Sequence, residues 1–104
     1  MASNTLSGDL ISERYGAALY DLASEKKCID DILNDFELVQ KALKESSELR
    51  QVIKSPLVNS DEKLNILLKL FSKANLHNLT TTFLKVLDNN KRISNIASII
   101  LQFK

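Results

Sequence analysis

Apolar residues recur at intervals of three and four positions along almost the whole chain. One run extends from Ile11 to Ala23, a second from Ile29 to Leu43 with a polar opposite face, and a short third from Leu49 to Ile53. This interval is the repeat of one face of an α-helix, whereas a half-buried strand alternates apolar and polar residues. The pattern therefore predicts helices rather than strands in the first half of the chain.

The chain's single proline marks the end of the third predicted helix. The residue before a proline is pushed out of the α region, so Ser55-Pro56 stops this helix. Asn59 or Ser60 can cap a fourth helix, with Asp61 and Glu62 at its positive end. We expect the fourth helix to bury Leu64, Leu67, Leu68, Leu70 and Phe71.

Two further helices complete the prediction. Residues 78–90 include three successive threonines, which lower helix propensity because they are β-branched. Leu79 and Phe83 nevertheless keep helical spacing, and no hairpin turn offers a strand partner. Asn89-Asn90-Lys91 then interrupts the pattern before a last apolar run from Ile93 to the end of the chain. Both segments are predicted to be helical.

Six helices joined by short loops predict an all-α fold, a six-helix bundle. The chain has 104 residues, of which 44% are hydrophobic and 26% charged. A domain of this size buries roughly 65% of its unfolded surface, which suffices for one core. We therefore expect a single domain over residues 1–104 that folds as a monomer.

Composition argues against several classes of function. The formal net charge is +1, whereas nucleic-acid binders usually have a large basic excess. One Cys cannot form an internal disulfide or a Cys-based zinc site, and no Gly-rich phosphate loop is present. No run approaches the 18 apolar residues of a membrane span. We expect no metal, no cofactor, no nucleic acid and no direct membrane insertion.

Few residues are candidates for catalysis. His77 is the only histidine, has no second ligand or nucleophile beside it, and is interpreted as a loop or cap residue. Cys28 begins the second helix, where a helix terminus can activate a thiol, but its only possible histidine partner is remote in sequence. Asp30-Asp31 and Asp61-Glu62 are explained by the positive ends of helices. We expect no catalytic residue and no enzyme.

The first helix is apolar over an unusually wide arc. Its small residues Gly16, Ala17 and Ala18 would let another helix come close. Its apolar positions form two stripes, one through Tyr15 and Ala18 and one through Gly16, Leu19 and Ala23. Such a helix either lies at the centre of the bundle, the reading that the sequence favours, or has a second face for a partner. The fifth helix is similarly broad.

Three passages resemble one known family. ERYGAALYDLASE is similar to the first-helix signature of the delta subunit of bacterial F-type ATP synthase, which is equivalent to the mitochondrial oligomycin-sensitivity-conferring protein; Gly16 stands where that pattern has alanine. LRQVIKSPLVNSDEKLNIL and TTFLKVLDNNKRISNIASIILQF resemble its later passages in the same order. The resemblance covers essentially the whole chain, as the amino-terminal domain of that subunit without its carboxy-terminal domain.

The resemblance implies a non-catalytic stator subunit. In that family the amino-terminal domain binds the amino-terminal helix of an alpha subunit, and so anchors the catalytic head against rotation during proton-driven ATP synthesis. The absent carboxy-terminal domain would bind the b-subunit stalk, and the complex would lie on the cytoplasmic face of the bacterial plasma membrane. The resemblance places the alpha-subunit helix between the first and fifth helices, on Ile11, Tyr15, Ala18, Leu22, Leu79, Phe83, Val86 and Asn90.

Two other classes of function remain open at this point. An unrelated all-α adaptor or regulatory module would also be small and non-catalytic, and failure to bind an alpha-subunit peptide would favour it. A cofactor-free helical enzyme would require an activity that disappears when His77 or Cys28 is replaced.

Overall fold

A computed structural model describes the backbone of residues 3–104 and the side chains from residue 10 onward. Over residues 3–104 it contains helices and no strand, so the predicted all-α six-helix fold is confirmed. None of the helices in this range is long and apolar enough to cross a membrane. The elements in chain order are α1 (Ser3–Glu25), α2 (Ile29–Glu45), α3 (Ser47–Lys54), α4 (Ser60–Leu70), α5 (Asn78–Asn89), the 3-10 turn η1 (Ile93–Asn95) and α6 (Ile96–Phe103).

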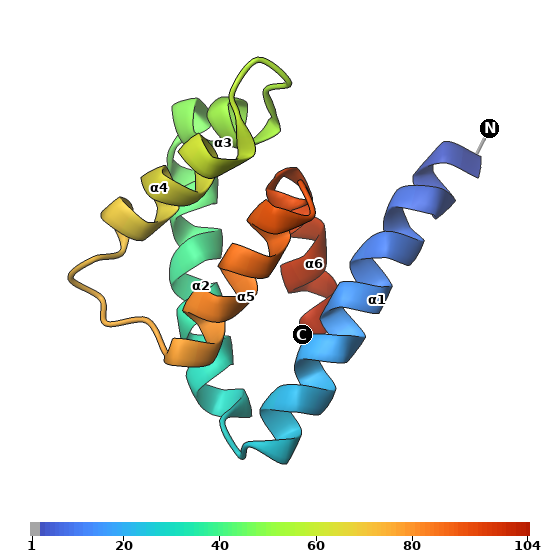
Figure 1. Cartoon of the computed structure of the whole chain (residues 1–104), viewed down its shortest axis with the longest axis vertical. Coiled ribbons are helices and arrows are strands. Elements are labelled where there is room, and N and C mark those ends of the chain that lie inside the picture. Colours follow the sequence, from blue (N-terminus) through green and yellow to red (C-terminus); the bar gives the residue numbers. More distant parts are fainter. Residues whose placement is uncertain (1–2) are drawn as a thin grey trace.

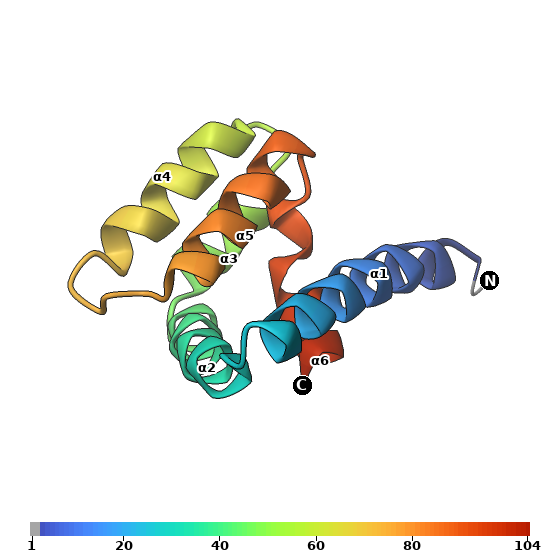
Figure 2. The same cartoon turned by 60° about the horizontal axis from the view of Figure 1, so that its bottom comes forward.

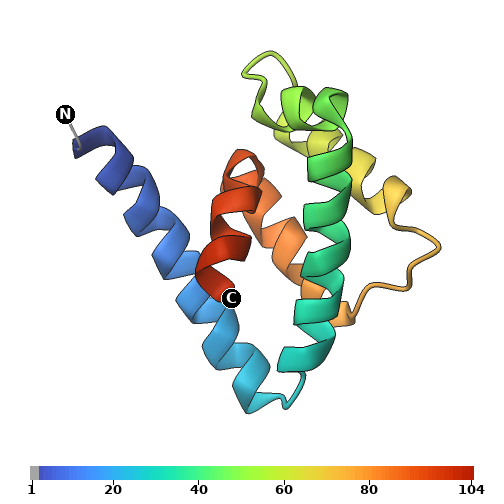
Figure 3. The same ribbon diagram turned by 180° about the vertical axis from the view of Figure 1, so that it is seen from behind.

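The helices surround α5 and α6, which lie between the two longest helices. In Figure 1, α1 runs down one side of the molecule and α2 rises on the other side. Seen from behind, α6 lies between α1 and α2 (Figure 3) and contacts both. Helix α4 lies at the far edge, side by side with α5 (Figure 2). The chain thus brings its first and last helices together.

Two of the helices end at a residue whose backbone is in the left-handed conformation. At the end of α1, Lys27 has φ 57°, and the Cys28 N–H donates to the Ala23 carbonyl at 2.8 Å while the Lys27 N–H donates to that of Ser24 at 3.1 Å. This pair of hydrogen bonds is the Schellman motif, which satisfies carbonyls that the helix leaves without a partner. The same motif ends α5 at Lys91, also with φ 57°. The predicted break at Asn89-Asn90-Lys91 is therefore a true helix end.

Phe36 links three helices at the centre of the core. This α2 residue is fully buried, and its ring centroid lies 6.4 Å from that of Phe83 on α5 and 5.2 Å from that of Phe103 on α6. Edge-on and tilted aromatic pairs at such distances contribute about 0.5–1.5 kcal/mol beyond the area they bury. Leu87 on α5 and Ile100 on α6 are also fully buried. The core therefore holds α5 and α6 against α2.

The closest approach of α1 to α6 occurs at Gly16. A Cβ atom at this buried position would lie 3.0 Å from Gln102 Cβ and 3.2 Å from the Phe103 backbone nitrogen. On the same side of α1, the ring of Tyr20 packs 5.5 Å from that of Phe103. A small residue in the first helix thus serves packing within the bundle.

Two leucines are placed differently from the prediction. Leu70 was expected in the core but is 53% exposed, because α4 lies at the edge of the bundle and its inner face is already filled by Leu64, Leu67 and Phe71. Leu38 is 41% exposed and interrupts the expected polar outer face of α2. The last predicted helix also begins later, since residues 93–95 form a 3-10 turn.

Candidate partner-binding groove

The residues considered as catalytic candidates lie at positions that serve the fold. His77 precedes α5, and its Nδ1 accepts a hydrogen bond from the Leu79 N–H at 3.0 Å, which confirms that it is a cap residue. Cys28 is buried between the end of α1 and the start of α2. Asp30-Asp31 and Asp61-Glu62 lie in the first turns of α2 and α4. Over the described part of the chain, no three His, Cys, Asp or Glu side chains gather where they could hold a metal ion.

A pair of aromatic rings joins α1 to α5. The ring of Tyr15 meets that of Phe83 edge-on, with centroids 6.3 Å apart and an angle of 69° between the ring planes. The backbones of α1 and α5 do not pack closely, in contrast to those of α1 and α6. This aromatic contact therefore lies at the base of the candidate groove, whose walls would be the outer parts of the two helices.

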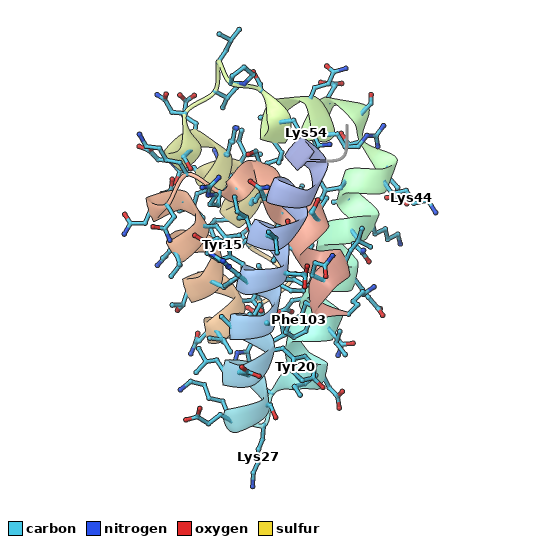
Figure 4. The ribbon with its side chains drawn as sticks, turned by 90° about the vertical axis from the view of Figure 1, so that its right-hand side faces the viewer. Tyr15, Tyr20, Lys27, Lys44, Lys54 and Phe103 are labelled. Carbon is cyan, nitrogen blue, oxygen red and sulfur yellow. The ribbon has the colours of Figure 1, made fainter. Side chains whose placement is uncertain are left out.

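The wall on α1 is a second apolar face of that helix. Ile11 and Tyr15 are half-buried, while Ala18 is exposed and Leu22 is 38% exposed. The other stripe, through Gly16, Leu19 and Ala23, is buried against the bundle. Viewed along the α1 side in Figure 4, Tyr15 points to one side of the helix and Tyr20 to the other. The reading of α1 as a wholly central helix is therefore wrong, and the stripe through Ala18 is open.

The wall on α5 has a buried base and an exposed rim. Leu79 and Phe83 are each 8% exposed and belong to the core, whereas Val86 is 42% exposed and Asn90 is exposed. Val86 is thus a branched apolar side chain that the bundle leaves uncovered. Together, the two walls present apolar surface on either side of the Tyr15–Phe83 contact.

A hollow of about 370 Å³ lies on the α1 wall near the end of α5, and its lining residues are Ile11, Arg14, Tyr15, Ala18 and Arg92. Three of these residues belong to the predicted site. Arg14 and Arg92 were not among its residues, although both lie in the passages that resemble the family: Arg14 directly precedes Tyr15, and Arg92 follows the break after the fifth helix.

A buried hydrogen-bonded cluster fixes the start of the α5 wall. Asp35 of α2 is 7% exposed, and its Oδ2 accepts hydrogen bonds from the His77 N–H at 2.8 Å and from Thr80 Oγ1 at 2.6 Å. Burying a carboxylate is costly unless hydrogen bonds replace its water. This cluster therefore ties α5 to α2 in one position and so sets where the groove wall stands.

A larger hollow, of about 600 Å³, lies between the α3–α4 loop and the turn after α5. Its lining is polar and carries opposite charges, with Asp61 and Asp88 beside Lys63 and Lys91. It lacks the apolar, aromatic-floored character of the groove.

The sequence comparisons identify the family. A sequence model described as ATP synthase delta (OSCP) subunit matches residues 11–104. The chain belongs to the ATP synthase delta (OSCP) subunit family.

Curated relatives in this family are bacterial proteins named ATP synthase subunit delta. That of Nitrobacter winogradskyi is 37% identical over 94 residues, covering 90% of this chain and 50% of the relative. That of Carboxydothermus hydrogenoformans is 37% identical over 93 residues, covering 89% and 51%. That of Bradyrhizobium diazoefficiens is 30% identical over 104 residues, covering 100% and 56%. The chain therefore spans about half the length of these delta subunits.

Proposed function

We propose that this chain is a stator module, part of the peripheral stalk of an F-type ATP synthase. In this role it binds the amino-terminal helix of an alpha subunit between α1 and α5 and anchors the catalytic head against rotation. The observation that carries the proposal is the open apolar stripe of α1, on which Ala18 and Leu22 are exposed, together with the exposed Val86 on α5 and the Tyr15–Phe83 contact that joins the two helices. The proposal assigns all eight predicted groove residues to this one contact.

The chemistry of the groove suits a helix. An amphipathic helix places apolar anchors at intervals of three, four and seven residues and lays that face into an apolar groove. A partner helix of about 20 residues would bury on the order of 1,200–1,600 Å² in total, a normal size for a specific interface. A stator transmits torque through packing rather than through a reaction, so it requires no catalytic residue.

The rest of the assembly follows from the same proposal. The role is non-catalytic, and the attachment to the membrane is indirect, through the other subunits of the synthase on the cytoplasmic face of the bacterial membrane. Contact with the b-subunit stalk would be made by a part of the delta subunit other than these helices. Membership of the family favours this function over the unrelated adaptor.

A titration with an alpha-subunit peptide tests the proposal. The chain contains no Trp, so a Trp placed on the polar face of the peptide would report binding without background from the protein. We expect saturable, one-to-one binding of the amino-terminal alpha-subunit peptide from the same organism, and none of a scrambled peptide of equal composition. Equal signals from the two peptides, or no saturation with either, would contradict the proposed function.

A further inference from the structure

The hollow in the groove carries two positive charges and no negative one. Arg14 and Arg92 both line it, and its remaining lining residues Ile11, Tyr15 and Ala18 are uncharged at neutral pH. Among the described side chains, neither guanidinium has a carboxylate within 4.0 Å or donates a hydrogen bond. Among the side chains from residue 10 onward, both cations are therefore without a partner, at a surface that is otherwise apolar.

Backbone geometry fixes the position of Arg92. Its N–H donates to the Leu87 carbonyl at 2.7 Å, and the preceding Lys91 N–H donates to that of Asp88 at 2.9 Å. These bonds close the Schellman motif at the end of α5, which turns the chain sharply and brings Arg92 back beside α1. Arg14 lies one residue before the aromatic floor residue Tyr15. Both arginines therefore stand on hydrogen-bonded backbone, Arg14 within α1 and Arg92 at the turn after α5.

Both arginines lie at the same end of the groove. In Figure 1, α1 descends while α5 rises, so the carboxyl end of α5 lies near the beginning of the α1 wall. Ile11, Arg14 and Arg92 share that end, whereas Leu22 lies two turns further along α1 and Leu79 lies at the start of α5. A bound helix would therefore meet both arginines at one of its ends.

A partner helix that covers the groove would make the two unpaired charges unfavourable. A helix laid over the hollow would remove water from both guanidiniums, and a buried cation without a partner is strongly unfavourable. A carboxylate beside them would offset this desolvation cost, because guanidinium and carboxylate groups match as paired hydrogen-bond donors and acceptors. Attraction of this kind also strengthens as the local dielectric falls. A partner without a suitable acid would be rejected.

We propose that Arg14 and Arg92 form a carboxylate-recognition site within the groove, which selects a partner helix carrying an Asp or Glu beside its apolar face and sets the direction in which that helix lies. This proposal rests on the proposed function, since it concerns the same groove and the same alpha-subunit helix. It adds a specificity determinant that the apolar contacts alone would not supply.

Arginine variants provide the first test. Arg14→Gln and Arg92→Gln remove one charge each, and Lys85→Gln is the matched control because Lys85 is exposed on α5 and lines none of the hollows described above. We expect each arginine change to weaken binding of the alpha-subunit peptide by about tenfold at low salt, and the control to change it by less than about twofold. Added salt should reduce the difference in peptide affinity between the wild-type chain and the arginine variants, because salt screens the charge interaction.

A double-mutant cycle identifies the carboxylate. Each Asp and Glu of the peptide is changed in turn to Asn or Gln and measured against the wild-type chain and both arginine variants. We expect one acid whose loss weakens binding to the wild-type chain but has little further effect on the arginine variants. Additive effects for every acid, or arginine variants that bind like Lys85→Gln, would overturn the recognition site while leaving the proposed function standing. Failure of the wild-type chain to bind the peptide would overturn both.

Discussion

Thr80 on α5 donates a buried hydrogen bond of 2.6 Å to the carboxylate of Asp35 on α2. The residues are 45 positions apart in sequence, and the same carboxylate oxygen also accepts the His77 N–H at 2.8 Å. One carboxylate therefore both caps the approach to α5 and holds its first turn against the core. Because α5 is a wall of the groove, this polar cluster contributes to the shape of the candidate site.

Removal of the Thr80 hydroxyl should destabilise the fold. Thr80→Val keeps the side-chain shape but leaves a buried carboxylate oxygen with one fewer donor, at a cost of about 1–3 kcal/mol. Urea unfolding measures the loss, and Thr82→Val, at an exposed position of the same helix, is the control. Equal midpoints for the two variants would mean that the Asp35–Thr80 hydrogen bond does not stabilise α5.

The contact between α1 and α6 should be intolerant of added volume. Gly16→Val would force atoms against Gln102 and the Phe103 backbone, and overpacking of this kind typically destabilises by about 1–3 kcal/mol. Ala17→Val places the same side chain on the exposed face of α1 and should have a smaller effect. Thermal unfolding compares the two. A Gly16 variant as stable as the Ala17 variant would show that α6 can move aside freely.

Substitution by glycine should affect the free energy of unfolding differently at Lys85 and at Lys91, two lysines near the end of α5. Lys91 has φ 57°, a conformation that costs a residue with a Cβ about 1–2 kcal/mol, so Lys91→Gly should raise the free energy of unfolding or leave it unchanged. Lys85 lies within α5, where Lys85→Gly should lower it by about 1 kcal/mol. Destabilisation by both substitutions to the same extent would contradict the left-handed helix end.

The periodicity of the sequence was sufficient to predict the helices but not every face. Helix positions follow from local spacing and from stop signals such as Ser55-Pro56, which act within a few residues. Whether a leucine is buried depends on which neighbours reach it, and Leu70 is exposed because nothing covers that side of α4. The sequence gives no sign that Asp35 is buried, since its donors His77 and Thr80 lie on a distant segment.

The groove was predicted only in part, for a similar reason. The width of the apolar arc on the first helix indicated a possible second face, but only the fold shows that Ala18 is open while Leu19 is buried. Arg92 was missed because the Schellman turn at Lys91, not helical spacing, brings it beside α1. Long-range placement of this kind leaves no periodic signal in the sequence.

The most direct test of the stator account compares binding with stability in groove variants. Ala18→Asp places a carboxylate in the hollow beside Arg14 and Arg92, where it would compete with the partner's acid, and Val86→Asp places one on the exposed apolar wall of α5. Ala17→Asp makes the same change on the outer face of α1. The account predicts that the two groove variants lose about 2 kcal/mol or more of binding free energy, roughly thirtyfold in affinity for the alpha-subunit peptide. It also predicts melting temperatures close to that of Ala17→Asp, which should bind normally. Unaltered binding in both groove variants, or a collapse of their melting temperatures, would contradict the assignment of this groove as the docking site.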